Sequence, residues 1–159
     1  MKKFPGRGFR RKERGSAAVE AAIVLPALIL FLAVPLFLAR IFWYYSVAEK
    51  AAHDGARFLS QATRLEIQAS SGGAEPAVVG LTKAIVNDEL DGIRPGLVGA
   101  TPSVLCDGLI CGGLSIPSTV RVAVQIRIRD EVFGFVTDPL FGGDGLLLTA
   151  DVTVHYAAQ

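Results

Sequence analysis

The chain has 159 residues with 16 Lys or Arg, 15 Asp or Glu and two Cys, so its formal net charge is only +1. This total hides an asymmetry, because the first 15 residues hold seven of the cations and one acid. The remainder has nine cations against fourteen acids, a net charge of −5. An acidic body argues against a nucleic-acid-binding surface, and the length allows one modest folded domain of about 115 residues.

A basic leader precedes a long apolar segment. Residues 21–39 contain no charged or strongly polar side chain, and at 1.5 Å per helical residue they extend about 28 Å, close to the hydrocarbon thickness of a bilayer. Arg40 ends the segment, and the aromatic residues at 42–45 suit the headgroup level. Seven cations before the span and one immediately after it predict a cytoplasmic N-terminus and an external C-terminal domain.

Three alternatives to a processed membrane anchor fit the apolar segment less well. A buried core helix would need a second apolar layer, which the rest of the chain does not offer. A secretory signal peptide usually has a shorter apolar region that ends in small residues, whereas this one ends in Phe37-Leu38-Ala39. An uncleaved signal anchor fits every feature except the acid at Glu20.

Glu20 is the informative exception, because an ionised carboxylate about one turn inside an apolar segment costs a few kcal/mol. If the chain is cut after Gly15, Ser16 becomes a free ammonium group four residues from Glu20 on the same helix face. The pair could form within one chain or between neighbouring subunits, where it would fix their axial register. The alternative is that Glu20 snorkels to the cytoplasmic interface.

Residues 15–20 (GSAAVE), behind a basic leader and before an apolar helix, resemble the processing site of type IV prepilins and pseudopilins. With residues 22–26 (AIVLP) and 48–57 (AEKAAHDGAR), they resemble the TadE-like minor pseudopilins of tight-adherence pilus systems. The resemblance implies a bacterial inner-membrane protein that a prepilin peptidase cuts after Gly15. It also implies a structural role at the assembly platform of a Flp-type pilus, with other pilin and pseudopilin subunits as partners.

The apolar pattern continues past the membrane at three- and four-residue intervals, which predicts one helix over residues 16–69. Gly55 lies close to Ala51, Ala52 and Ala56 there, and these four residues form a small-residue stripe. This small-residue stripe could pack on the protein's own domain or on other pilin subunits, and both alternatives stay open. The polar, glycine-rich residues 70–73 predict a break, a second helix is expected over residues 75–90, and irregular chain over 95–102.

The remainder of residues 74–159 predicts a small antiparallel sheet. Residues 119–129 and 146–156 alternate apolar and polar side chains, as half-buried strands do. A third strand near residues 102–106 would stabilise the pair. Residues 132–145 are expected to form a loop folded over the sheet edge, or a hydrophobic contact loop. The expected fold class is therefore α+β and pilin-like.

Cys106 and Cys111 are the two cysteines. Outside the inner membrane they would lie in an oxidising compartment, so a local disulfide is the leading hypothesis. They lack the second ligand pair of a metal site and the two-residue spacing of redox motifs. Hydrolase, phosphate-binding and dinucleotide-binding motifs are absent from the sequence. We therefore expect a protein without cofactor, metal or enzymatic activity. The alternative is an uncleaved, signal-anchored envelope protein that carries a sensor or binding domain.

Overall fold

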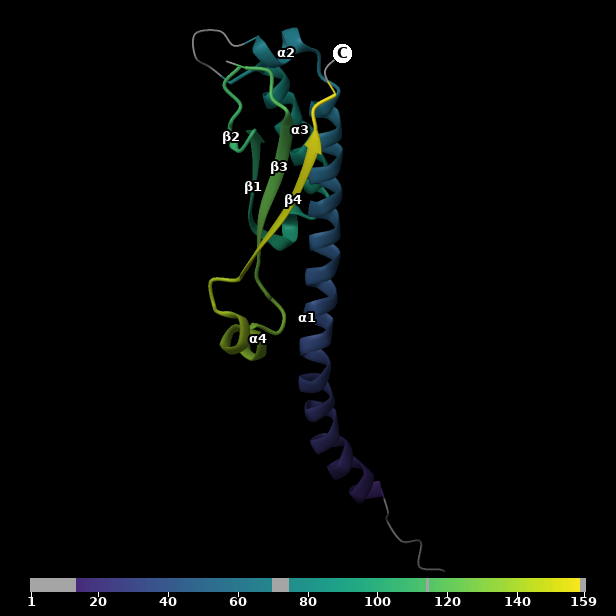
Figure 1. The fold of residues 1–159 in the computed structure, drawn as a ribbon. Helices are drawn as coiled ribbons and strands as arrows, with labels where there is room; N and C mark the ends of the chain where they lie inside the picture. Colours follow the sequence, from purple (N-terminus) through teal and green to yellow (C-terminus); the bar gives the residue numbers. More distant parts are fainter. Residues whose placement is uncertain (1–13, 70–74, 114, 158–159) are drawn as a thin grey trace, which may run out of the picture.

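The computed structural model describes residues 14–69, 75–113 and 115–157, so most of the basic leader and the break expected at 70–73 lie outside the described residues. Its main feature is the 47-residue helix α1 (Arg14–Ser60), which is about 70 Å long. The C-terminal half of α1 packs on a small domain that contains a sheet, and the N-terminal half projects away from it (Figure 1). This is the α+β architecture that the sequence predicts.

The projecting half of α1 is apolar and uncovered. Every residue from 17 to 32 is exposed, and by length and composition the helix can cross a membrane. Pro26 and Pro35 lie inside it without ending it. We therefore describe the chain as membrane-anchored.

Helix α1 ends earlier than expected. The prediction of one helix to residue 69 is wrong, because a turn separates α1 from the short helix α2 (Arg64–Gln68). The Thr63 hydroxyl accepts the backbone N–H of Glu66, and the Glu66 carboxylate accepts the N–H of Thr63 at 2.8 Å. This capping box starts a new helix, and its hydrogen bonds lower the pKa of Glu66.

The end of the chain completes the turn after α1. The Tyr156 hydroxyl donates to the Ala62 carbonyl at 2.6 Å, and the N–H of Ala157 donates to the Ser60 carbonyl at 3.2 Å. Carbonyls at a helix C-terminus have no partner within the helix. Two of the carbonyls in this region are thus satisfied by residues almost 100 positions away.

Helix α3 (Ala77–Asp91) begins two residues later than expected, after Pro76 at its N-cap. The first N–H groups of a helix have no acceptor within the helix. Proline is therefore compatible with a helix start, because its missing N–H costs no hydrogen bond there. Its buried face consists mainly of branched aliphatic residues. These are Val78, Val79, Val86 and Leu90.

Four antiparallel strands follow in the spatial order β2-β1-β3-β4. Their bounds are β1 (Leu97–Cys106), β2 (Leu109–Ile110), β3 (Thr119–Ile128) and β4 (Leu146–His155). The predicted pairing of β3 with β4 is confirmed by a continuous register that includes Val122 opposite Val152. On the outer face, Arg121 forms an ion pair with Asp151, with 2.9 Å between nitrogen and oxygen.

Strand β1 corrects the expectation of irregular chain up to residue 102. It starts at Leu97, shifts register before Gly99 and continues through Pro102. Proline is tolerated at sheet edges. Strand β2 pairs only with Leu105 and Cys106, so β1 has an unpaired outer edge at Pro102.

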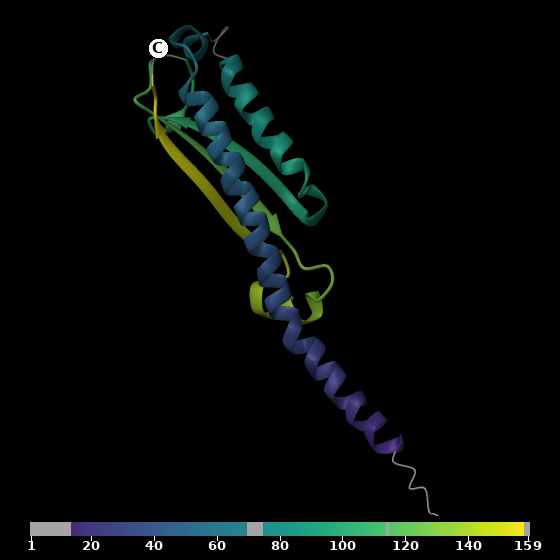
Figure 2. The same ribbon diagram turned by 90° about the vertical axis from the view of Figure 1, so that its right-hand side faces the viewer.

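Helices α1 and α3 cover one face of this sheet (Figure 2). The small-residue stripe of α1 makes that approach possible, because Ala51, Ala52 and Ala56 are fully buried. At Gly55 an added Cβ would lie 2.7 Å from Val86 of α3. The sequence left open whether the small-residue stripe packs on the protein's own domain or on other subunits. In the structure it packs on the protein's own domain.

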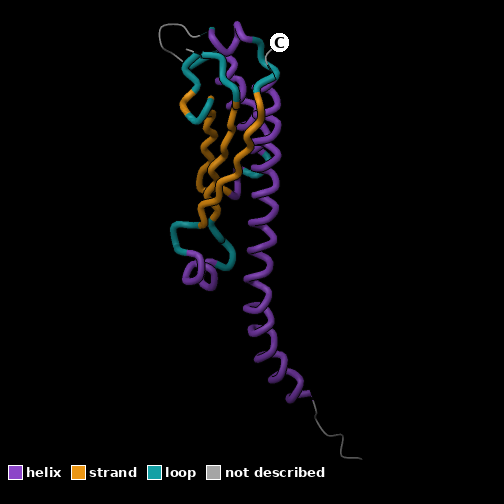
Figure 3. Tube along the Cα trace, in the orientation of Figure 1, coloured by secondary structure: helices purple, strands orange, loops and turns teal. Residues whose placement is uncertain are grey.

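The connection between β3 and β4 holds helix α4 (Gly134–Phe141), where a loop over the sheet edge was expected. Helix α4 lies beyond the end of the sheet and contacts α1 (Figure 3). The Asp130 carboxylate accepts the N–H groups of Val132 and Phe133, both at 3.0 Å, and the hydroxyl of Thr137. These bonds fix the loop that leads into α4, and contacts with α1 position the helix.

Candidate functional site

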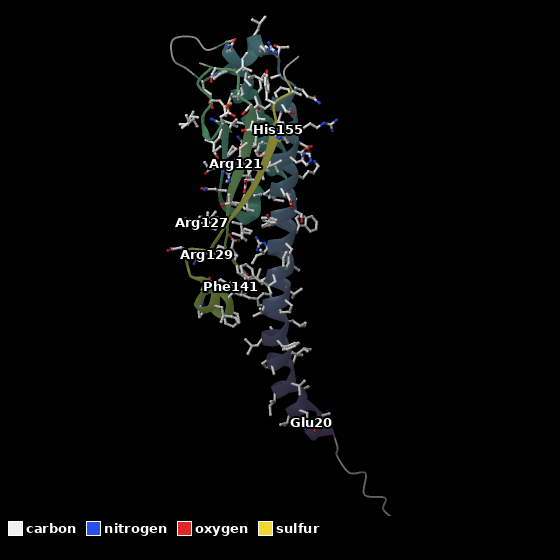
Figure 4. All side chains as sticks on the ribbon, in the orientation of Figure 1. Glu20, Arg121, Arg127, Arg129, Phe141 and His155 are labelled. Atoms are coloured by element: carbon white, nitrogen blue, oxygen red, sulfur yellow. A yellow bond between two sulfur atoms is a disulfide. The ribbon has the colours of Figure 1, made fainter. Side chains whose placement is uncertain are left out.

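The expected processing site lies in the first turns of α1. Gly15 and Ser16 have helical backbone, and so does Glu20. Ser16 and Glu20 are thus about 6 Å apart along the axis, on the same face. Glu20 is exposed and lies at the end of α1 that is far from the sheet (Figure 4). A new amine at Ser16 would have the spacing that a pair with this carboxylate needs.

A second feature is located where the apolar half of α1 ends. Arg40 donates one hydrogen bond to the Tyr44 hydroxyl at 3.1 Å and another to the Gly96 carbonyl at 3.3 Å. A Cβ on Gly96 would overlap the ends of both side chains, so a larger residue there would displace them. The first charge after the apolar segment is therefore bound to Gly96, directly before β1, so the folded domain begins where the apolar segment ends. Local sequence carries no signal for this contact, which spans 56 residues.

Cys106 and Cys111 form a disulfide, with 5.0 Å between their Cα atoms. It closes the short hairpin of β1 and β2 across Asp107 and Gly108, whose φ angles are 49° and 82°. Positive φ at both central residues is typical of a two-residue hairpin turn. The disulfide thus supports a strand of only two residues.

Asp107 ties the same hairpin to the start of β3. Its carboxylate accepts hydrogen bonds from the backbone N–H and hydroxyl groups of both Ser118 and Thr119, at 2.7–3.1 Å. The Ser118 hydroxyl contributes most, and together these donors lower the pKa of Asp107 to about 2. The sequence does not predict this network, although an Asp-Gly pair between apolar residues is a known hairpin signal.

The low pKa of Asp107 predicts a pH-dependent stability. The pKa of Asp107 is about 2 in the folded protein and 3.8 ordinarily. The ionised carboxylate of Asp107 therefore stabilises the fold above about pH 4, and this stabilisation is lost as the pH falls towards 2. Asp107→Asn tolerates the positive φ but lacks the charge. We expect the thermal midpoint of the full chain in detergent to fall less steeply from pH 4 to 2 in this variant than in the native protein. Asp88→Asn, on α3 and outside the network, is the control, and equal slopes for Asp107→Asn and the native protein would contradict the assignment.

The two histidines lie on different elements. His53 is on α1, and His155 is on β4. Within residues 14–69, 75–113 and 115–157, no three His, Cys, Asp or Glu side chains are grouped so that they could hold a metal ion.

Comparison with known proteins finds a family match over most of α1. Residues 15–57 match the family model of TadE-like proteins. The resemblance inferred from the sequence is thus confirmed for this part of the chain. Neither a curated protein nor a solved structure matches the chain.

The TadE-like match starts at Gly15 and stops three residues before the end of α1. It therefore includes the candidate processing site, the apolar span and the small-residue stripe, and it leaves the sheet outside. A TadE-like segment implies involvement in a tight-adherence pilus system.

Proposed function

We propose that the protein is a minor pseudopilin that acts structurally in the assembly of a tight-adherence, Flp-type pilus. A prepilin peptidase removes the leader by cutting after Gly15. The observation that carries the proposal is the TadE-like match, which begins at Gly15 and includes Glu20 at the start of the exposed apolar helix.

The physical basis is the combination of one acid with an uncovered apolar surface. Residues 17–32 of α1 have no partner within the described domain and are exposed, so in the membrane they contact lipid. Neighbouring pilin helices offer the same surface an equally apolar environment. The Ser16 ammonium created by the cut pairs with Glu20, either in the same chain or in the next subunit.

The orientation follows from charge. The seven cations of the leader precede the span, so the N-terminus lies in the cytoplasm and the sheet domain in the periplasm or outside the cell. The disulfide between Cys106 and Cys111 suits this oxidising side. We place the protein in the bacterial inner membrane, where the peptidase, the other pilin subunits and the assembly platform are its partners, and we assign it no enzymatic role.

An N-terminal mass measurement tests the proposal. The protein extracted from membranes of its own cells should begin at Ser16 if the peptidase acts on it. The competing function, an uncleaved signal-anchored sensor or binding protein, requires a chain that begins at Met1 or Lys2. A mature protein that retains its first 15 residues would exclude the processed pseudopilin.

A further inference from the structure

Helix α4 lies beside the membrane span and not above it. Within residues 17–41 of α1, only Ala33, Phe37 and Ile41 are buried, and they form one stripe at four-residue intervals. The ring of Phe141 at the end of α4 packs on that of Phe37, with 5.4 Å between centroids. Both ribbon views place α4 next to α1 at this height (Figures 1 and 2), and Figure 4 labels Phe141 there.

The height of α4 can be compared with the membrane boundary. Phe37 precedes Arg40 by three residues, which is about 4.5 Å along a helix axis. Arg40 is the first charge after the apolar segment and marks its end. Amphipathic helices at a membrane surface bury their apolar face about 5–10 Å into the boundary between headgroups and acyl chains. Helix α4 therefore lies at the depth of such a helix.

Three large apolar side chains of this connection are exposed, together with the acids Glu131 and Asp144. Val132, Phe135 and Leu140 are all largely exposed although they are large hydrophobic residues. Large exposed apolar side chains that gather on one short segment are typical of an interaction site.

Two acids of the connection have partners, whereas Glu131 and Asp144 are exposed. The Asp130 carboxylate is buried and accepts three hydrogen bonds, and Asp138 lies 3.8 Å from Arg129. This pairing lowers the cost of bringing Asp130 and Asp138 close to lipid. Arg127 and Arg129 lie on the sheet side of α4 (Figure 4), where long cationic side chains can reach headgroups.

We propose that the β3–β4 connection, residues 130–145, is a second membrane contact that inserts the apolar face of α4 into the leaflet on the side of the sheet domain. The occupant is lipid, because α4 packs on the membrane span itself. Residues 127–145 carry two Arg against four acids, so apolar area and not charge binds the membrane, and zwitterionic lipid suffices. The contact depends on the anchor and not on cleavage at Gly15, so it can fail or hold separately from the pseudopilin function.

Site-directed labelling of the full chain tests this contact. The described cysteines are joined in a disulfide, so Phe135→Cys introduces a site for a fluorescent label. The matched control is Leu109→Cys on β2, because Phe135 is 71% exposed and Leu109 74%. Each labelled chain is reconstituted in phosphatidylcholine vesicles. We expect quenching by nitroxide lipids to be several-fold stronger at position 135 than at 109, and quenching by aqueous iodide to be several-fold weaker.

Equal quenching at the two positions would overturn the proposal. A Leu140→Cys label provides an independent reading should the change at 135 disturb folding. Shielding at 135 that disappears when the protein is diluted in excess lipid would identify a second copy of the chain as the occupant and would also overturn it. Shielding that persists on dilution, in both cleaved and uncleaved chains, supports the lipid contact.

Discussion

Glu20→Ala is expected to leave the cut after Gly15 intact and to reduce pilus assembly at least about tenfold. The substitution removes the carboxylate that we propose pairs with the new ammonium group at Ser16. Two unit charges 4 Å apart attract by about 4 kcal/mol at an effective dielectric constant of 20. A third of that attraction, about 1.4 kcal/mol, already changes an assembly equilibrium about tenfold. Electron microscopy of pili together with the N-terminal mass of the mature protein measures both parts.

Three further variants separate charge, position and processing. Glu20→Gln keeps the size of the side chain and loses the charge, so it should fail like the alanine variant. Glu49→Ala removes an exposed acid from the same helix beyond the apolar segment and should assemble normally. Gly15→Leu should leave the leader attached. Normal pilus numbers in Glu20→Ala would rule out the role assigned to this carboxylate.

Gly55→Val is expected to lower the free energy of unfolding of the sheet domain by about 2 kcal/mol or more. The first added carbon would lie 2.7 Å from Val86 Cγ2 and 3.5 Å from Val122 Cγ1, both on fully buried residues. Overpacking a dense core typically costs about 1–3 kcal/mol. Thermal unfolding of the full chain in detergent, followed by near-ultraviolet circular dichroism, measures the loss.

The control for Gly55 is the same substitution at Gly80, on the exposed side of α3. A Cβ at Gly80 meets no atom within 4 Å, so Gly80→Val should change the unfolding free energy by less than about 0.5 kcal/mol. This pair separates overpacking from the effect of valine on helix propensity. Equal midpoints for the two variants would show that α1 and α3 approach each other less closely than the structure has them.

Much of the fold could be predicted because its signals are local in the chain. The charged leader, the apolar segment 21–39 and Arg40 identify the membrane anchor from composition and length alone. The alternation of apolar and polar residues in β3 and β4 predicts both strands to within one residue and also identifies their buried faces. The motif at residues 15–20 predicts a processing site in the same way, since a peptidase recognises contiguous residues.

The rest was decided by contacts between residues far apart in the sequence. Pro102 can occupy a strand because β2 is too short to pair with it, and Gly55 faces α3 because the two helices share one face of the sheet. Arg40 donates a hydrogen bond to the carbonyl of Gly96. Helix α4 lies beside the apolar half of α1 because the ring of Phe141 packs on that of Phe37. Each contact depends on how separate elements pack. Composition and periodicity describe one element at a time, so only the tertiary structure could place these residues together.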